Sequence, residues 1–128
     1  MGYEIIIALT NDGKILGTDE SFYKGYHDFI QVDAYGHYYG DCYSMALRRN
    51  GTEMSPNFKE ASAWNDIVQI AVGWDVSLGL RRDGKVEITT YDADVTEIVS
   101  SWNNIVNLEC KFSQIIAISE DCKFIALI

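Results

Sequence analysis

Two histidines, three cysteines and a pair of aspartates are the residues of this chain whose types could carry chemistry. The histidines, His27 and His37, have no cysteine or carboxylate partners at the spacing of a metal site. Asp92 and Asp94 resemble the start of a calcium loop, but the glycine and terminal glutamate of such a loop are missing. Motifs for nucleophilic catalysis or phosphate binding are missing as well. The sequence therefore predicts no metal, no cofactor and no enzyme.

The cysteines indicate a reducing compartment. Cys42, Cys110 and Cys122 are odd in number and form no C-x-x-C pair, which favours reduced, partly buried thiols over a disulfide framework. The apolar stretch near the start is too short and lacks the basic lead of a signal peptide, and no apolar run is long enough to span a bilayer. We expect a cytoplasmic protein without a membrane segment.

The net charge of −9 opposes attraction to nucleic acids and anionic membranes, and it favours solubility or a basic partner. The acids are unevenly distributed. Two stretches, 25–47 and 86–110, contain no lysine or arginine but carry Asp28, Asp33, Asp41, Glu87, Asp92, Asp94, Glu97 and Glu109. A solvated face is the commoner explanation of such runs.

An internal repeat organises the chain. Residues 67–86 align with residues 105–124 without a gap at an offset of 38, and Trp64 then matches Trp102. Another step back places Tyr26 in the same position. A turn recurs four times, as "TNDGKI" (10–15), "RRNGTE" (48–53), "RRDGKV" (81–86) and "SEDCKF" (119–124). A fixed period of this size is typical of repeat proteins, whose units bury their apolar faces on one another.

Each unit is expected to contain at least three short antiparallel strands. "IVQIAV" and "VSLGL" are short, apolar and β-branched, and the Asp-Gly or Asn-Gly pair predicts a type I′ hairpin turn between the second and third strands. Cys122 replaces the turn glycine in the last unit, so it must accept a positive φ or the turn must differ. "VTEIVSSW" (95–102) could form a helical turn but is interpreted as a connector. The predicted fold is all-β, a single domain (1–128) with units of approximately 1–25, 26–63, 64–101 and 102–128.

The aligned residues resemble a known family. "WNDIVQIAVGW" followed by "LGLRRDGKV" is similar to the bacterial-type repeat of the regulator of chromosome condensation family. The resemblance covers residues 64–86 well, 102–124 fairly, and 26–53 and 3–16 loosely. It implies β-propeller architecture, here a partial propeller of three to four units. It also implies a protein-interaction platform, since no motif for nucleotide exchange or chromatin binding is present.

Two insertions break the period and supply the candidate binding residues. One lies around residues 36–42, between the first and second strands of its unit, and the other around residues 90–97. Insertions in repeat proteins map to loops, often on the binding face. The candidate partner-binding residues are His37, Tyr38, Tyr39, Asp41, Asp92, Asp94 and Glu97. A loop that only covers the open flank of the propeller is the alternative.

Two functions are consistent with these features. The first is a non-catalytic module that binds a protein partner through the inserted loops and an acidic surface. The second is an acidic inhibitor of the mobile-element or phage type, which blocks a nucleic-acid-binding enzyme such as a defence nuclease by presenting carboxylates in place of phosphates. The inhibitor requires the acids of both runs on one surface. Sugar binding ranks third and would require exposed, coplanar aromatic rings in a groove.

Two structural expectations follow from the repeat. Trp64, Trp102 and Tyr26 should occupy equivalent, largely buried positions between units. Both ends of the sequence interrupt a unit with apolar, strand-like segments, so we expect a homo-oligomer formed through an end of the sheet array.

Overall fold

The computed structural model describes residues 5–36 and 42–127. These residues form short strands joined by turns and by three helical segments. The strands are β1 (Ile7–Leu9), β2 (Ile15–Gly17), β3 (Phe29–Gly36), β4 (Cys42–Arg48), β5 (Glu53–Met54), β6 (Ile67–Gly73), β7 (Val76–Arg81), β8 (Val86–Thr89), β9 (Ile105–Lys111), β10 (Gln114–Ser119) and β11 (Phe124–Leu127). The helical segments are α1 (Glu20–Tyr23), the 3-10 helix η1 (Lys59–Ala63) and α2 (Ala93–Ser100).

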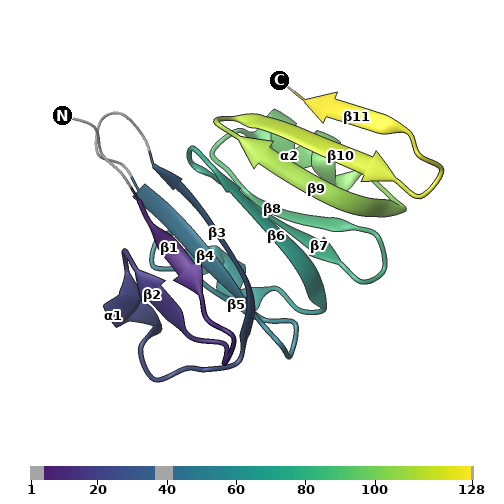
Figure 1. Cartoon of the computed structure of the whole chain (residues 1–128). Helices are drawn as coiled ribbons and strands as arrows, with labels where there is room; N and C mark the ends of the chain where they lie inside the picture. Colours follow the sequence, from purple (N-terminus) through teal and green to yellow (C-terminus); the bar gives the residue numbers. More distant parts are fainter. Residues whose placement is uncertain (1–4, 37–41, 128) are drawn as a thin grey trace.

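The strands form four antiparallel sheets that follow one another along the chain. These are β1–β2, β3–β4–β5, β6–β7–β8 and β9–β10–β11. Figure 1 shows the sheets side by side in this order, with the first and last at opposite ends of an open row. The all-β prediction is confirmed, as is the three-stranded antiparallel unit for the last three sheets. Among the described residues, the first sheet has only two strands.

The turn glycines let neighbouring sheets approach closely. The Gly51 carbonyl accepts a hydrogen bond from the Ile67 amide (3.0 Å), and the Gly84 carbonyl accepts one from the Ile105 amide (2.9 Å). A Cβ on Gly84 would lie 3.0 Å from the Asn104 Cα. The glycine is therefore required where the next unit begins.

The type of this turn differs from the prediction. Gly51 has φ of 87°, but the preceding Asn50 does not have a positive φ, which a type I′ turn would require. The Gly51 amide donates to the Arg48 carbonyl (3.0 Å), and the Arg48 amide donates to the Thr52 carbonyl (2.8 Å). This bonding is that of a type I turn followed by a left-handed glycine, which forms a bulge. Cys122 does accept a positive φ, of 66°.

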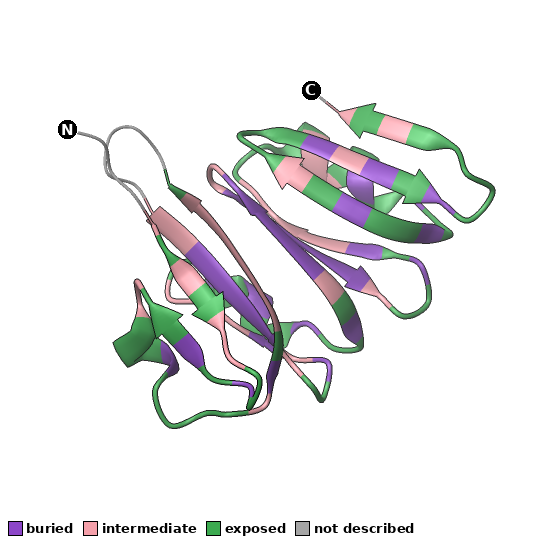
Figure 2. Ribbon diagram, viewed as in Figure 1, coloured by how far each residue is buried: buried purple, intermediate pink, exposed green. Residues whose placement is uncertain are grey.

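Three apolar cores fill the three spaces between the four sheets. Figure 2 shows the buried positions concentrated where the sheets face one another. Trp64 belongs to the core between the second and third sheets, and Trp102 to the core between the third and fourth. Both are buried, as the repeat predicts.

The prediction for Tyr26 is wrong, because its side chain is 42% exposed. Tyr23 of α1 is fully buried instead, and its position corresponds to Ala61 in η1 and Val99 in α2. The tyrosine ring is far larger than either of those side chains. It fills the space in the core, and Tyr26 lies outside, with its ring 5.2 Å from the Arg48 guanidinium carbon.

The interpretation of residues 95–102 as a connector is also wrong, since α2 occupies Ala93–Ser100. The Asp92 carboxylate caps this helix by accepting hydrogen bonds from the amides of Asp94 (3.0 Å) and Val95 (3.3 Å). Val95 and Val99 lie one turn apart on the face that packs against the core. The cap and the apolar spacing together stabilise a short helix in an otherwise β-rich chain.

Candidate functional site

The hairpins formed by the first two strands of the last three sheets point to the same end of the sheet row. The β6–β7 turn consists of Trp74 and Asp75, and the β9–β10 turn consists of Phe112 and Ser113. The β3–β4 hairpin reaches the same end, at the top of Figure 1. This convergence follows from the repeat, because equivalent strands in neighbouring sheets run in the same direction.

Aromatic rings connect these turns. Phe112 contacts Tyr35 (centroids 6.0 Å apart) and Trp74 (5.5 Å), in both cases edge to face. The Tyr43 hydroxyl donates a hydrogen bond to the Asp75 carboxylate (2.8 Å), which joins the second sheet to the third. Together with the exposed Tyr91 described below, these residues form what we call the tip surface: Tyr35, Tyr43, Trp74, Asp75, Tyr91 and Phe112.

Two turn residues of the tip surface have an uncommon backbone conformation. Asp75 has φ of 54° and Phe112 has φ of 59°. A left-handed conformation is unfavourable for an aromatic residue, and residues held in it cluster at binding sites. The Phe112 carbonyl accepts a hydrogen bond from the Trp74 amide (2.7 Å), and a Cβ on Gly73 would lie 2.3 Å from the same oxygen. The scaffold thus holds the Phe112 ring at the surface.

The second insertion borders this end of the molecule. Tyr91 is 93% exposed and lies beside two hollows of about 500 and 330 Å³, both of which are also lined by Asp75. Tyr43 lines the first hollow, and Trp74 and Asp92 line the second. An exposed tyrosine next to concave surface is typical of protein interfaces, where aromatic side chains fill pockets on the partner.

The structure settles the position of only some predicted site residues. His37, Tyr38, Tyr39 and Asp41 lie outside the described residues, between Gly36 and Cys42. The period break that identified them therefore falls in the β3–β4 hairpin, at the end that carries the tip surface. The described residues on either side of this segment, Gly36 and Cys42, pair with each other at the junction of β3 and β4.

The three acids of the second insertion differ in their roles. Asp92 lines one hollow of the tip surface, but its carboxylate is also the cap of α2. Asp94 lies in the first turn of α2, where its negative charge is favourable to the helix dipole. Glu97 lies further along the exposed side of the helix. The second insertion is thus largely helix rather than loop, because Asp92 starts α2 there.

The other acids of the two runs are dispersed. Asp28 forms an ion pair with Arg48 (2.9 Å). The Asp33 carboxylate accepts a hydrogen bond from the Val72 amide (2.8 Å), and burial, together with the charge of Glu109, raises the pKa of Asp33. These contacts place acids of the first run at an ion pair and at the junction of the second and third sheets. Asp28 and Asp33 therefore lie in different local environments, and Asp33 lies close enough to Glu109 of the second run to be affected by its charge.

The chemistry available to the described residues is limited. Burial raises the pKa of the Cys110 thiol to about 12, so this thiol is not a nucleophile at neutral pH. No group of three histidine, cysteine or acidic residues suited to a metal occurs within residues 5–36 and 42–127. In the same ranges, no helix has the length and apolar character needed to cross a membrane.

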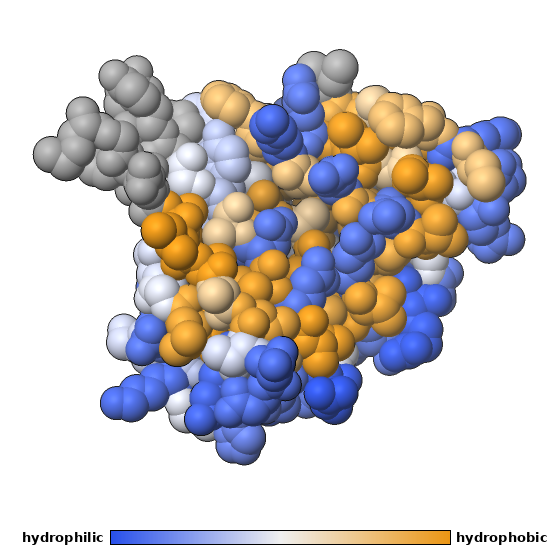
Figure 3. All heavy atoms as spheres, viewed as in Figure 1, coloured by the Kyte–Doolittle hydropathy of each residue, from blue (hydrophilic) through white to orange (hydrophobic). Residues whose placement is uncertain are grey.

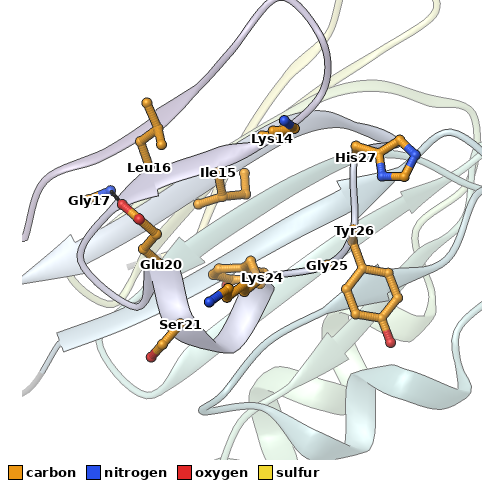
Figure 4. Close-up of a pocket in the computed structure, with 11 residues that line it drawn as sticks. Lys14, Ile15, Leu16, Gly17, Glu20, Ser21, Lys24, Gly25, Tyr26 and His27 are labelled. Atoms are coloured by element: carbon orange, nitrogen blue, oxygen red, sulfur yellow. Dashed lines mark hydrogen bonds between the residues drawn. The ribbon is translucent and has the colours of Figure 1, made fainter.

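A hollow of about 650 Å³ lies beside α1, at the first sheet. Figure 4 shows Glu20 and Lys24 on the helix side and the rings of Tyr26 and His27 on the other. The Glu20 carboxylate accepts a hydrogen bond from the Gly17 amide (3.0 Å), so it already has a local structural partner. The hollow combines both signs of charge without converging polar groups, and we assign no chemistry to it.

Comparisons with models of protein families and with curated protein sequences found no match for this chain. The tip surface is therefore assigned as a candidate site from its geometry alone. The sequence did not predict Trp74 and Phe112 as site residues, because the candidate residues were taken from the two insertions and the aromatic residues considered in the repeat were Trp64, Trp102 and Tyr26. Their position in a turn, between paired strands, was the signal that distinguishes them from Trp64 and Trp102.

Proposed function

We propose that this protein is a non-catalytic interaction module that binds a protein partner through the tip surface. The observation that carries this proposal is the group of aromatic residues held at the ends of adjacent hairpins, with Phe112 in a left-handed conformation. Tyrosine, tryptophan and phenylalanine supply large contact areas at small entropic cost. The proposal includes residues 37–41, which the sequence predicts to form a loop, and Asp92, which lines one of the hollows.

We further propose that the row of sheets is a partial β-propeller of the regulator of chromosome condensation type. Repeated contacts support this proposal. The first strand of each three-stranded sheet, which we call the inner strand, packs on the sheet before it: β3 on β1, β6 on β3 and β4, and β9 on β6 and β7. A rigid row of this kind positions turns of successive units next to one another. The thiols and the charge are consistent with a cytoplasmic protein.

The acidic inhibitor remains the second candidate, supported by the net charge of −9. The dispersal of Asp28, Asp33 and the acids of α2 makes it the weaker of the two, since a phosphate mimic needs its carboxylates on one surface. The two candidates differ in their salt dependence. A carboxylate mimic loses affinity steeply with salt, whereas an aromatic interface does so weakly.

The test begins with an affinity capture of partners from the native host, identified by mass spectrometry, followed by titration of the purified partner. We expect the Tyr91→Ala and Phe112→Ser variants each to weaken binding about tenfold or more. Ile98→Ala is the matched control, because Ile98 is 44% exposed and lies on α2 away from the hollows.

A second pair of variants tests the insertions. One deletes residues 37–41, and the other reverses the charges of Asp92, Asp94 and Glu97. Since Asp92 caps α2, the melting temperature of the charge-reversal variant must be compared with that of Asp92→Asn. If all four surface variants melt normally and bind the partner as the wild type does, the tip surface is not the binding site.

A further inference from the structure

The outer face of the last sheet exposes apolar side chains. Ile116, Ile118 and Phe124 occupy the positions of Leu78, Leu80 and Val86 in the third sheet, which are covered there by the fourth sheet. In the last sheet the covering unit is absent among the described residues, and Ile118 is 37% and Phe124 67% exposed. In Figure 3, apolar side chains reach the surface among polar ones over this sheet.

Polar side chains on the inner strands β3 and β6 form hydrogen bonds to the backbone of the inner strand of the next sheet. The side-chain amide of Gln31, on β3, makes two hydrogen bonds to the backbone of β6. Its Nε2 donates to the Ile70 carbonyl (3.2 Å), and its Oε1 accepts from the Ile70 amide (3.0 Å). Two residues further along β3, the Asp33 carboxylate accepts from the Val72 amide (2.8 Å). These bonds are made to the backbone of an incoming strand, so they do not depend on its side chains.

The same arrangement recurs one unit later. Gln69 lies 38 residues after Gln31, and its side chain makes two hydrogen bonds to the backbone of Leu108 in β9. The Gln69 Nε2 donates to the Leu108 carbonyl (3.3 Å), and the Gln69 Oε1 accepts from the Leu108 amide (3.1 Å). A glutamine at this position therefore binds the next inner strand at two junctions, between the second and third sheets and between the third and fourth.

In β9 the equivalent positions are Asn107 and Glu109, and both side chains are exposed. The Asn107 Oδ1 accepts a hydrogen bond from Gln69 (2.9 Å), while its Nδ2 donates none within the described residues. The last sheet thus presents an amide and a carboxylate two residues apart, beside an apolar surface, as the second sheet presents Gln31 and Asp33 to β6.

We propose that this outer face binds an extended strand from a partner protein, with apolar residues at alternate positions. Asn107 and Glu109 bind the backbone of the strand, and Ile116, Ile118 and Phe124 contact its apolar side. The occupant is a strand from another protein rather than a further unit of this repeat, because Cys122 places a Cβ at the position where Gly51 and Gly84 receive the next unit.

Cys122 limits how the strand can enter. The corresponding Gly51 and Gly84 accept the first amide of the next inner strand, and a Cβ on Gly84 would lie 3.0 Å from the incoming backbone. Cys122 has a Cβ at this position, so a further unit of the same repeat cannot approach as closely. A partner strand that diverges before the turn avoids this contact.

The probe is a fluorescent peptide with the sequence of residues 68–73, "VQIAVG", extended by lysines for solubility. It contains the part of β6 that Gln31 and Asp33 bind, and it omits Asp66 and Ile67, which lie against the Gly51 turn. We expect saturable binding to the full chain by fluorescence anisotropy. Ile118→Lys and Phe124→Lys should each weaken it about tenfold or more, since they place a charge on the apolar contact. Ile98→Lys, on α2, should bind as the wild type does, since Ile98 has an exposed fraction (44%) between those of Ile118 and Phe124.

The backbone contacts are tested separately with peptides N-methylated at the residues equivalent to Ile70 and Val72. Methylation removes the two amide donors and should abolish binding, whereas methylation at Ala71 should have little effect. A peptide of the same composition in scrambled order is the control. The proposal is overturned if this scrambled peptide binds equally well or if the position of methylation makes no difference. It is also overturned if Phe124→Lys converts a dimer to a monomer in light scattering, because the face would then bind a second copy. Tyr91→Ala should leave peptide binding unchanged, so this test is independent of the tip surface.

Discussion

Glu53 is a buried carboxylate in a position that other units fill with apolar side chains. It is 4% exposed, and Ile15 and Val86 occupy the equivalent buried positions in the first and third sheets. Its two carboxylate oxygens are buried without a hydrogen-bond partner within the described residues. Burial, with a further contribution from the charge of Glu87, raises the pKa of Glu53 to about 8.

This pKa predicts a pH-dependent stability. The folded protein holds the proton of Glu53 up to about pH 8, whereas the unfolded chain releases it near the ordinary value of 4.5. The free energy of unfolding should therefore fall as the pH rises from 4.5 to 8, by on the order of 3 kcal/mol at pH 7. Glu53→Gln should remove most of this fall, as measured by urea unfolding at several pH values. Glu97→Gln, at an exposed position, is the control, and an identical pH profile for wild type and Glu53→Gln would contradict the prediction.

Trp64 is the residue on which the second core depends. It is buried between the second and third sheets, and Gly79 lies against its ring. Trp64→Ala should lower the free energy of unfolding by roughly 3–5 kcal/mol, since it leaves a large cavity. Chemical denaturation at pH 7 measures the change, and Tyr91→Ala, which removes an exposed ring, should have almost no effect. A loss below about 1 kcal/mol would show that this position is not part of the core.

At the scale of elements, the glycine of the recurrent turn meets two separate requirements, a positive φ and space for the backbone of the next unit. Gly84 has a positive φ and also lies against the backbone of the next unit, whereas Cys122 has a positive φ without a following unit among the described residues. The first position needs both a left-handed conformation and free space. The second needs the conformation alone.

Gly84→Ala should therefore destabilise the protein by more than about 1 kcal/mol, since strain and contact both oppose the Cβ. Cys122→Gly should change the stability by less than about 1 kcal/mol, because the relief of strain is offset by the greater freedom of glycine in the unfolded chain. Thermal unfolding of the two variants at equal concentration makes the comparison. Equal destabilisation by both changes would indicate that close approach at Gly84 is unimportant.

At the scale of the whole molecule, the row of sheets is open at two ends. Leu16 of the first sheet and Ile6, the residue before β1, are exposed, and the last sheet exposes Ile118 and Phe124. Exposed apolar sheet faces favour association with another chain. The two ends differ, because the last sheet carries Asn107 and Glu109 at the positions from which Gln31, Asp33 and Gln69 bind the backbone of the next sheet.

We expect self-association through the first sheet. Light scattering at micromolar concentration should give a mass above the 14.5 kDa of one chain, and Leu16→Lys should restore the monomer. Phe124→Lys should leave the mass unchanged, because it alters the opposite end. A wild type that is monomeric at every concentration would show that the first sheet is sufficiently covered by its own chain.

The sequence by itself determined the local features. The alternation of short β-branched runs with Asp-Gly or Asn-Gly pairs indicated hairpins, and the offset of 38 located Trp64 and Trp102 in equivalent core positions. These predictions were confirmed because hairpin formation and residue burial depend mainly on nearby sequence and its repetition. The prediction for residues 95–102 was a connector that could form a helical turn, and the Asp92 cap of α2 became evident only in the structure.

Only the tertiary structure decided which side chains meet across units. Tyr23 took the core space expected for Tyr26 because one large ring excludes another, and this competition has no local signature. Phe112 reached the surface beside Tyr35 because successive hairpins end at the same side of the row. The burial of Glu53, the dispersal of the acids and the backbone grip of Gln31 and Gln69 likewise depend on the packing of one sheet on the next, which strand patterns alone do not specify.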